Sequence, residues 1–166
     1  MFKDYQQFVL SKAAPPRPIN EKDFQLLHSA LGLSTEFLEY DIAHNREDIL
    51  EEVGDLVWYM MLTAHAVEFP ITNLPDSVES RNHPLLDLST DIERFVSLVK
   101  KHCIYGADKS KELPLVFYSM WRSFVAFCQD EEIELDVLIA ENQNKLNKRY
   151  AAAFTTQESE DRKDKQ

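Results

Sequence analysis

Two pairs of acidic residues have the types and the spacing to hold a metal ion. Glu36 and Glu39 lie three positions apart in one amphipathic stretch, and Glu52 and Asp55 repeat that spacing in the next. Residues three apart share one face of a helix, so antiparallel helices would bring the four carboxylates together. Such a cluster would raise its own pKa values, and a hard divalent cation would resolve the repulsion. Oxygen ligands of this kind predict Mg²⁺ or Mn²⁺.

The alternative is that these acids form a solvated helix face, because Glu-x-x-Glu is common on acidic helices. Two other metal sites are excluded by their ligands. No Glu has a His three residues later, as a carboxylate di-iron bundle requires, and the His-Glu-x-x-His motif of zinc proteases is missing. Trp58 and Tyr59, shortly after the second acidic pair, could offer an aromatic platform for a substrate.

Two groups of polar and cationic residues could bind phosphate. Lys100 and Lys101 begin a basic stretch, and Asn142, Lys145 and Arg149 fall roughly on one helix face further along the chain. Donors of these types bind phosphate oxygens. The alternative is that the cations only complement the dipoles of helix C-termini.

The elements that must position these residues are helices. Only 3 Gly occur in 166 residues, which disfavours a turn-rich β-sandwich, and apolar residues recur at helical spacing. The predicted fold is an all-α domain over residues 1–154, followed by a disordered tail that has no apolar residue. The expected segments are a short N-terminal helix at Phe2–Lys12, a first helix pair at 21–67, a Pro-containing linker at 70–84, a second helix pair at 85–130, a C-terminal helix at 135–150 and the tail at 155–166.

A sequence pattern that occurs twice in the chain, which we call the echo, predicts how the helix pairs are related. The frame Leu-x-Leu-Ser-Thr occurs at residues 31–35 and 86–90, an offset of 55, and Leu56-Val-Trp-Tyr59 matches Leu115-Val-Phe-Tyr118 at an offset of 59. Two such pairs would form a pseudo-symmetric four-helix bundle, unless the match arose by chance. The second pair would then carry no metal, because the four acids are replaced by Asp91, Arg94, Lys111 and Pro114. We therefore expect one site per chain, complete without a second subunit, although a homodimer is also allowed.

The net charge and the small number of cysteines indicate which binding partners and which cell compartment we expect. The chain has 18 Lys+Arg against 29 Asp+Glu, a balance that disfavours nucleic acid as a partner. No apolar run is long enough for a membrane span, and the N-terminus lacks the build of a signal peptide. Cys103 and Cys128 are too few for a disulfide framework, so we expect buried free thiols and a cytoplasmic location.

Two of these motifs together resemble the MazG-like all-α nucleoside triphosphate pyrophosphohydrolases, which are related to the dimeric dUTPases. The family's acidic pattern reads here Thr35-Glu36-Phe-Leu-Glu39, twelve residues, then Glu52-Val-Gly-Asp55. The stretch from Asn142 through Lys145 to Arg149-Tyr150 is similar to the family's ending, and the segment from Lys100 to Gly106 looks like one in phage-type members.

The resemblance implies a reaction in which a nucleoside triphosphate and water give the monophosphate and pyrophosphate, with Mg²⁺ as cofactor. The alternative is a catalytically inactive bundle of the same fold that binds a nucleotide or a protein partner. A purely structural bundle would require both motif matches to be accidental. The implied metal ligands and catalytic residues are Glu36, Glu39, Glu52 and Asp55, and the implied substrate-binding residues are Lys100, Lys101, Asn142, Lys145, Arg149, Tyr150 and Trp58.

Overall fold

The helices begin where the sequence offers caps. In the computed structural model, which describes residues 2–150 and 155–161, Asn20 and Asn45 each accept a backbone N–H three residues later through their side-chain oxygen. These caps start the second and third helices of the chain. The elements are α1 (Phe2–Lys12), α2 (Glu21–Ile42), α3 (Arg46–Ala66), the 3₁₀ turn η1 (Ile71–Asn73), α4 (Pro84–Val99), the π-helical turn η2 (Lys100–Ile104), α5 (Leu113–Asp130), α6 (Leu135–Arg149) and α7 (Thr156–Asp161).

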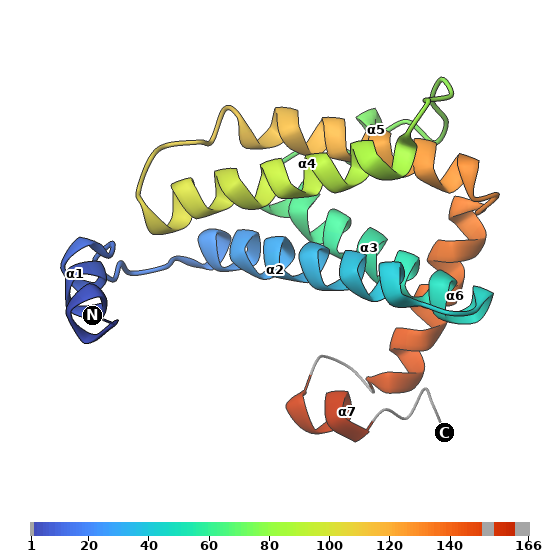
Figure 1. Cartoon of the computed structure of the whole chain (residues 1–166). Helices are drawn as coiled ribbons and strands as arrows, with labels where there is room; N and C mark the ends of the chain where they lie inside the picture. The colour runs from blue at the N-terminus through green and yellow to red at the C-terminus, as the bar shows by residue number, and fades with distance from the viewer. Residues whose placement is uncertain (1, 151–154, 162–166) are drawn as a thin grey trace.

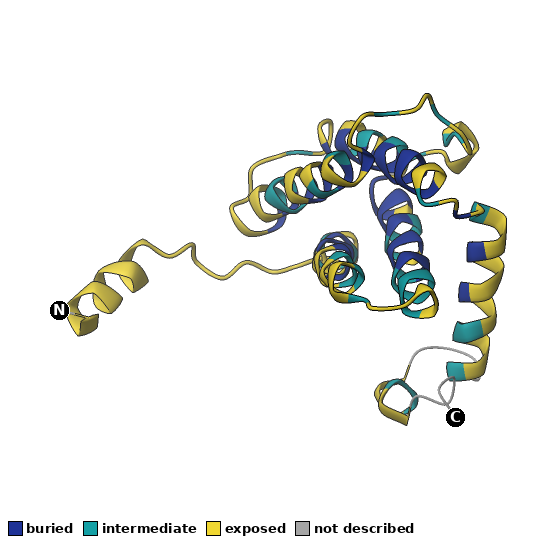
Figure 2. Ribbon diagram, turned by 45° about the vertical axis from the view of Figure 1, so that its right-hand side comes forward, coloured by how far each residue is buried: buried dark blue, intermediate teal, exposed yellow. Residues whose placement is uncertain are grey.

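Four of these helices form the bundle (Figure 1). α2 and α3 make one hairpin, α4 and α5 make a second, and the hairpins pack together through α2 on α4 and α3 on α5. Their inward faces enclose a continuous apolar core, which Figure 2 shows as buried faces turned toward one another. Burial of a large apolar side chain stabilises the fold by about 1.5–3 kcal/mol. The prediction of an all-α fold with a four-helix core is thus confirmed.

α6 lies across one end of the bundle and packs on α3 (Figures 1 and 2). Its bounds agree with the predicted helix at 135–150 to within one residue. Only Leu138 and Asn142 of this helix are buried, so its attachment depends on polar contacts as well as on apolar packing. Those contacts reach the acidic residues of α3.

Burial corrects the offsets that the echo predicts. At an offset of 59, Leu56, which is fully buried, would match Leu115, which is 72% exposed. At an offset of 60, the buried residues of α3 match buried residues of α5, except that Gly54 meets the half-buried Pro114; the matching pairs include Val53 with Leu113, Leu56 with Val116, Val57 with Phe117, Met60 with Met120, Thr63 with Ser123, and Ala64 with Phe124. The echo failed because a short apolar pattern fits a helix in more than one register.

The first helices of the two hairpins show the same effect. An offset of 62, and not 55, matches buried with buried: Leu26 with Leu88, Ser29 with Asp91, Ala30 with Ile92, and Leu33 with Phe95. The residues at the places of the four acids are therefore Leu98, Lys101, Glu112 and Leu115, and not Asp91, Arg94, Lys111 and Pro114. Either set lacks the four-acid pattern, so the expectation that only the first hairpin carries it is unchanged.

The C-terminal tail departs in part from the predicted disorder. Thr155 caps α7 by accepting the backbone N–H of Glu158 at 3.2 Å, and its hydroxyl donates to the Glu158 carboxylate at 2.8 Å. Gln157 adds a bond to Asp161 one turn later. These local bonds allow a short helix although none of its residues is buried. The rest of the predicted tail, residues 162–166, lies outside the described residues.

Both cysteines are buried free thiols, as predicted. Burial raises the pKa of Cys103 to about 11 and that of Cys128 to about 12. Within the described part of the chain, no helix combines the length and apolar composition that a bilayer crossing requires.

Candidate metal and phosphate site

The antiparallel α2–α3 hairpin brings three carboxylates of the two acidic pairs together. One oxygen from each of Glu36, Glu39 and Glu52 lies within 4.8 Å of the others. Asp55 follows Glu52 by one helical turn, and its charge acts on Glu36. The convergence predicted for four carboxylates therefore occurs for Glu36, Glu39 and Glu52, while Asp55 lies one turn further along α3.

The cluster shows the electrostatic conflict expected of crowded acids. Burial, followed by the charges of Asp55, Glu39 and Glu52 and a hydrogen bond with Glu52, raises the pKa of Glu36 to about 8. The pKa of Glu52 is also raised, first by burial and then by the charge of Glu39. Near neutral pH, without a bound cation, Glu36 holds a proton for much of the time. A bound cation would offset the repulsion among the carboxylates and so favour the ionised form of Glu36.

The donor set suits a hard divalent cation. Magnesium with ligands at about 2.1 Å in octahedral geometry places neighbouring ligand oxygens about 3 Å apart. Oxygens already within 4.8 Å of one another need only small side-chain movements to share such an ion. Glu36, Glu39 and Glu52 could hold it, and Asp55 could join them.

Asp55 is held from the other side by α6. The Lys145 ammonium donates to both carboxylate oxygens of Asp55, at 2.5 and 2.6 Å, and the Asn142 amide donates to one of them at 2.8 Å. Lys145 is largely buried, with 14% of its side chain exposed. The charge of Asp55 is therefore already balanced in the structure.

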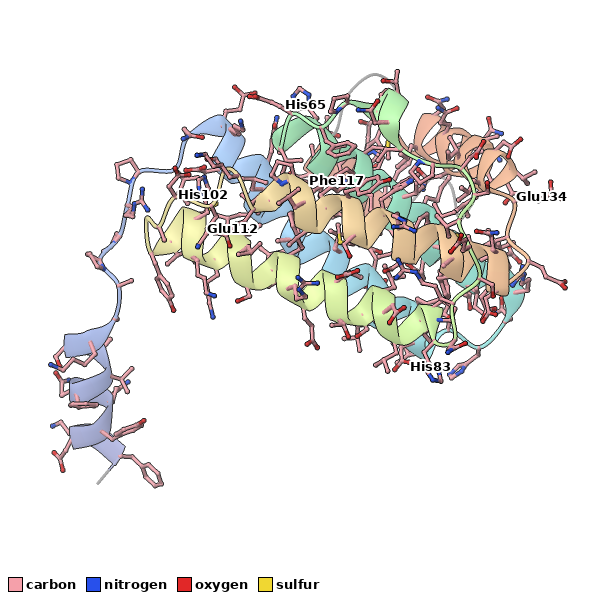
Figure 3. The ribbon with its side chains drawn as sticks, turned by 90° about the horizontal axis from the view of Figure 1, so that it is seen from above. His65, His83, His102, Glu112, Phe117 and Glu134 are labelled. Carbon is pink, nitrogen blue, oxygen red and sulfur yellow. The ribbon has the colours of Figure 1, made fainter. Side chains whose placement is uncertain are left out.

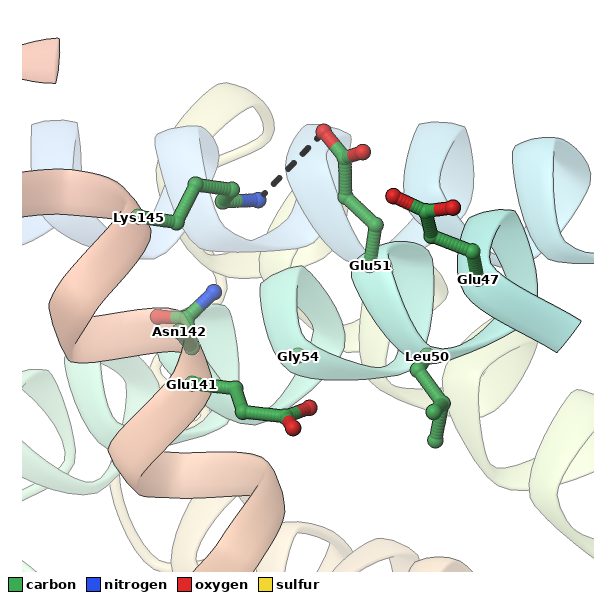
Figure 4. Close-up of a pocket in the computed structure, with 7 residues that line it drawn as sticks. All are labelled: Glu47, Leu50, Glu51, Gly54, Glu141, Asn142 and Lys145. Atoms are coloured by element: carbon green, nitrogen blue, oxygen red, sulfur yellow. Dashed lines mark ion pairs between the residues drawn. The ribbon is translucent and has the colours of Figure 1, made fainter. Parts of the chain in front are cut away.

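A second ion pair strengthens the same contact between α3 and α6. A carboxylate oxygen of Glu51 lies 3.8 Å from the Lys145 ammonium nitrogen (Figure 4), and the same oxygen lies 3.8 Å from a guanidinium nitrogen of Arg149. Glu51 and Asp55 are four residues apart on α3, and Lys145 and Arg149 are four apart on α6. The sequence therefore carries a signal for the docking of α6, namely two acids and two cations at the same i, i+4 spacing. The site predicted from sequence does not include Glu51, which is part of this signal.

A cleft of about 220 Å³ opens beside these ion pairs, between α3 and α6. Figure 4 shows its lining: Glu47, Leu50, Glu51, Gly54, Glu141, Asn142 and Lys145. Gly54 permits the close approach of the helices, because a Cβ at this position would lie 3.1 Å from the Asn142 amide nitrogen. The cleft thus gives a small molecule access to one side of Lys145.

Two aromatic residues of α3, Tyr59 and Trp58, border the acidic cluster, and Tyr59 packs against α2. The Tyr59 ring lies so close to Gly32 that a Cβ there would overlap it. Burial and then the charges of Glu36 and Asp55 raise the pKa of Tyr59, which places its hydroxyl within the field of the cluster. Trp58 contacts Tyr59 edge-on, with ring centroids 4.9 Å apart, and remains 39% exposed. Both residues of the predicted aromatic platform thus lie beside the cluster.

The predicted lysines of the second hairpin lie elsewhere. Lys100 and Lys101 belong to η2, which contacts the start of α2 through Asp23: His102 Nε2 lies 3.5 Å from Asp23 Oδ1, and Cys103 Sγ lies 3.6 Å from the Asp23 carbonyl oxygen. Thirteen residues of α2 separate Asp23 from Glu36, or about 20 Å along the helix. Figure 3 shows His102 and Glu112 at the opposite end of the bundle from Glu134, which precedes α6.

The structure therefore does not bring Lys100 and Lys101 together with the acidic cluster, and their predicted contact with the substrate stays a prediction. Among the described residues, the cations beside the acidic cluster are Lys145 and Arg149 of α6. The second hairpin, whose residues are all described, contributes no cation at this place. The cause is the antiparallel packing of α4 on α2, which carries η2 to the far end of α2. Tyr150 follows the end of α6 and acts electrostatically on Tyr59, while residues 151–154 of the motif lie outside the described residues.

Comparison of this chain with family models, curated proteins and solved structures gives no match.

Proposed function

We propose that this protein is a Mg²⁺-dependent nucleoside triphosphate pyrophosphohydrolase. The observation that carries the proposal is the convergence of Glu36, Glu39 and Glu52 next to the ion-paired Asp55 and Lys145. An anionic triphosphate needs cations, and this is the place where a carboxylate-held metal and a buried lysine would lie side by side. The family resemblance stated above points to the same reaction.

In the proposed reaction, water attacks the α-phosphorus of the nucleotide. A bond forms from the water oxygen to that phosphorus, the bond to the bridging oxygen of the β-phosphate breaks, and pyrophosphate leaves with the electron pair. Bound Mg²⁺ supplies positive charge that neutralises the phosphates. One carboxylate of the cluster accepts the proton of the attacking water.

The residues of α6 would complete the site on the phosphate side. Lys145 pairs with Asp55 in the structure. If Asp55 bound the metal ion instead, the Lys145 ammonium would be free to contact the outer phosphates. Arg149 lies one turn further along and could contact the same phosphates. Trp58, exposed beside Tyr59, offers a surface for the base.

The test is a product assay on the full chain with a panel of ribo- and deoxyribonucleoside triphosphates and Mg²⁺. We expect pyrophosphate and the monophosphate, and loss of both in Glu39→Gln and Glu52→Gln. Asp41→Asn is the matched control, because Asp41 is exposed on α2 and lies outside the cluster. Orthophosphate as the primary product, or full activity in both cluster variants, would contradict the proposal.

The Asp55–Lys145 pair also favours a second candidate, an inactive bundle that binds a nucleotide or a protein partner. In such a protein the lysine would permanently take the place of a metal at Asp55. This candidate predicts that nucleotides raise the melting temperature while no pyrophosphate appears at any Mg²⁺ concentration. Turnover that is lost in the cluster variants would exclude it.

A further inference from the structure

The N-terminal helix α1 presents an apolar face that is exposed throughout, with none of its residues buried against the described part of the bundle. Phe2, Tyr5, Phe8 and Val9 share one side of this helix, which we call the arm face. Phe2 is 82% exposed, Tyr5 64% and Phe8 56%, and none of the residues of α1 is buried. Figure 2 shows α1 standing apart from the bundle and exposed along its length. Three aromatic rings on one face of a short helix are costly to leave in water.

A second exposed apolar surface runs along α2, beside the contacts of His28 with Trp58 and Tyr59. Phe24, Leu31 and Leu38 recur every seven residues, and Ile42 follows one turn later, all about 60% exposed. These residues, with His28 and Thr35 between them, form a continuous row on the side of α2 opposite the buried Leu26 and Leu33. We call this row the outer stripe. Its alternating spacing of four and three residues is that of a helix seam that receives another helix.

The linker between the two helices holds α1 away from its own bundle. Pro15, Pro16 and Pro18 restrict φ and make residues 13–20 a stiff extended segment. Arg17 fixes this segment: its guanidinium donates to the His102 carbonyl oxygen at 3.3 Å and lies against Gly106, where a Cβ would overlap it. Figure 1 shows α1 beyond the start of α2, and not folded back along it.

We propose that α1 is an arm that docks its apolar face on the outer stripe of a second copy of this chain. A reciprocal exchange satisfies both surfaces of both copies with one two-fold contact. Aromatic rings bury roughly 150–250 Å² each. Three rings in each of two arms, with the stripe area that they cover, reach the roughly 1,200–2,000 Å² of a stable interface.

Charge supports the same pairing. Residues 1–20 carry three cations, at Lys3, Lys12 and Arg17, against one anion, Asp4. Apart from Glu36, which is largely protonated, α2 carries four anions against the single cation Lys22. An arm packed on another arm, or a stripe on another stripe, would place like charges together, whereas the arm on the stripe places opposite charges together.

The test is the mass of the full chain in solution, measured by light scattering after size exclusion, for the wild type and two charge-insertion variants. Phe8→Glu damages the arm face and leaves the stripe intact, and Leu31→Glu does the reverse. Both residues are exposed, so circular dichroism should show unchanged helicity. Gln7→Glu, on the other side of α1, and Ser34→Glu, exposed beside the stripe, are the matched controls.

We expect a wild-type dimer, dimeric controls and two monomeric variants. An equimolar mixture of the two variants should recover a weaker dimer at high protein concentration, because one intact arm then meets one intact stripe while the second contact of the pair stays damaged. A monomeric wild type would overturn the proposal, and so would a mixture that stays monomeric. A dimeric Phe8→Glu variant would indicate stripe on stripe, a dimeric Leu31→Glu variant would indicate arm on arm, and either result would overturn it. None of these outcomes depends on the proposed enzymatic activity.

Discussion

The ammonium of Lys145 donates to both carboxylate oxygens of Asp55, at 2.5 and 2.6 Å, from a helix that begins 80 residues later in the chain. This pair joins the acidic hairpin to α6 and gives the fourth carboxylate a positive partner. Because 14% of the lysine side chain and 21% of the aspartate side chain are exposed, water screens the pair only in part. Its removal should therefore be felt in both stability and function.

The first prediction is that Lys145→Met lowers turnover by about 100-fold, the order expected when one group that stabilises developing charge is removed. In the absence of metal, the variant should also melt at a lower temperature, because Asp55 loses its cationic partner. Added Mg²⁺ should restore more of the melting temperature in the variant than in the wild type, since Asp55 is then free to bind it.

Lys148→Met is the control for this experiment. Lys148 lies on the same helix and is exposed. The measurements are pyrophosphate release and thermal denaturation with EDTA or with Mg²⁺. Equal activity in the Lys145 and Lys148 variants would remove Lys145 from the site.

The second prediction follows from the position of η2. Lys100→Ala and Lys101→Ala should each leave kcat and KM for a triphosphate within about twofold of the wild type, because surface charges separated by more than about 10 Å are largely screened at physiological salt. Steady-state kinetics of these variants beside Lys145→Met makes the comparison. A tenfold rise in KM in either η2 variant would show that these lysines reach the substrate.

The parts of the site predictable from sequence are those that a single hairpin determines. The caps Asn20 and Asn45 set where α2 and α3 begin, and the short turn between them fixes which acids face one another. The location of Lys100 depends instead on how one hairpin packs on the other. No local sequence pattern indicates the relative orientation of the two hairpins. A sequence echo cannot replace this information, because Leu56 and Leu115 match in type and differ completely in burial.

The docking of α6 falls between these cases. The sequence placed Asn142, Lys145 and Arg149 on one face, and the structure shows that this face meets α3. Sequence spacing indicates Asp55 only as a metal ligand and does not include Glu51 in the site, so it does not predict the ion pairs of Lys145 with Asp55 and of Arg149 with Glu51. Acidic residues can serve two partners, and spacing alone does not say which partner is present.

The third prediction concerns pH and the metal-free protein. The pKa of Glu36 is about 8 in the folded state against 4.5 as its ordinary value, so between these values the folded chain binds more protons than the unfolded chain. The contribution of this group to stability is therefore fully present below about pH 4.5 and is lost as pH rises toward 8. Glu36→Gln should flatten the decline in melting temperature over this window.

Thermal denaturation in EDTA at closely spaced pH values measures this effect, with Asp41→Asn as the control. Mg²⁺ should stabilise the wild type more at pH 8 than at pH 6, because its ligands must lose their protons to bind. A wild-type melting temperature that rises steadily from pH 5 to pH 8 in EDTA, with the same profile in Glu36→Gln, would refute the prediction.

The last prediction concerns a buried polar network that locks the second hairpin. Asp91 on α4 is 5% exposed and accepts hydrogen bonds from Ser119 and Ser123 on α5, both at 2.9 Å. Arg81 in turn donates to the Ser123 hydroxyl at 2.8 Å, and Arg94 donates to the other Asp91 oxygen at 3.1 Å. A buried carboxylate that loses a donor keeps its desolvation cost without compensation.

Ser123→Ala should therefore lower the free energy of unfolding by about 1–3 kcal/mol, because it removes a donor from Asp91 and an acceptor from Arg81. Arg94→Ala should cost less than about 1 kcal/mol, since water reaches that side chain, which is 60% exposed. Urea denaturation of both variants, with Thr90→Ala on the exposed face of α4 as the control, measures the difference. Because the network lies outside the first hairpin, both variants should keep full Mg²⁺-dependent turnover, and equal stability losses in the two would show that the serine donors do not hold Asp91.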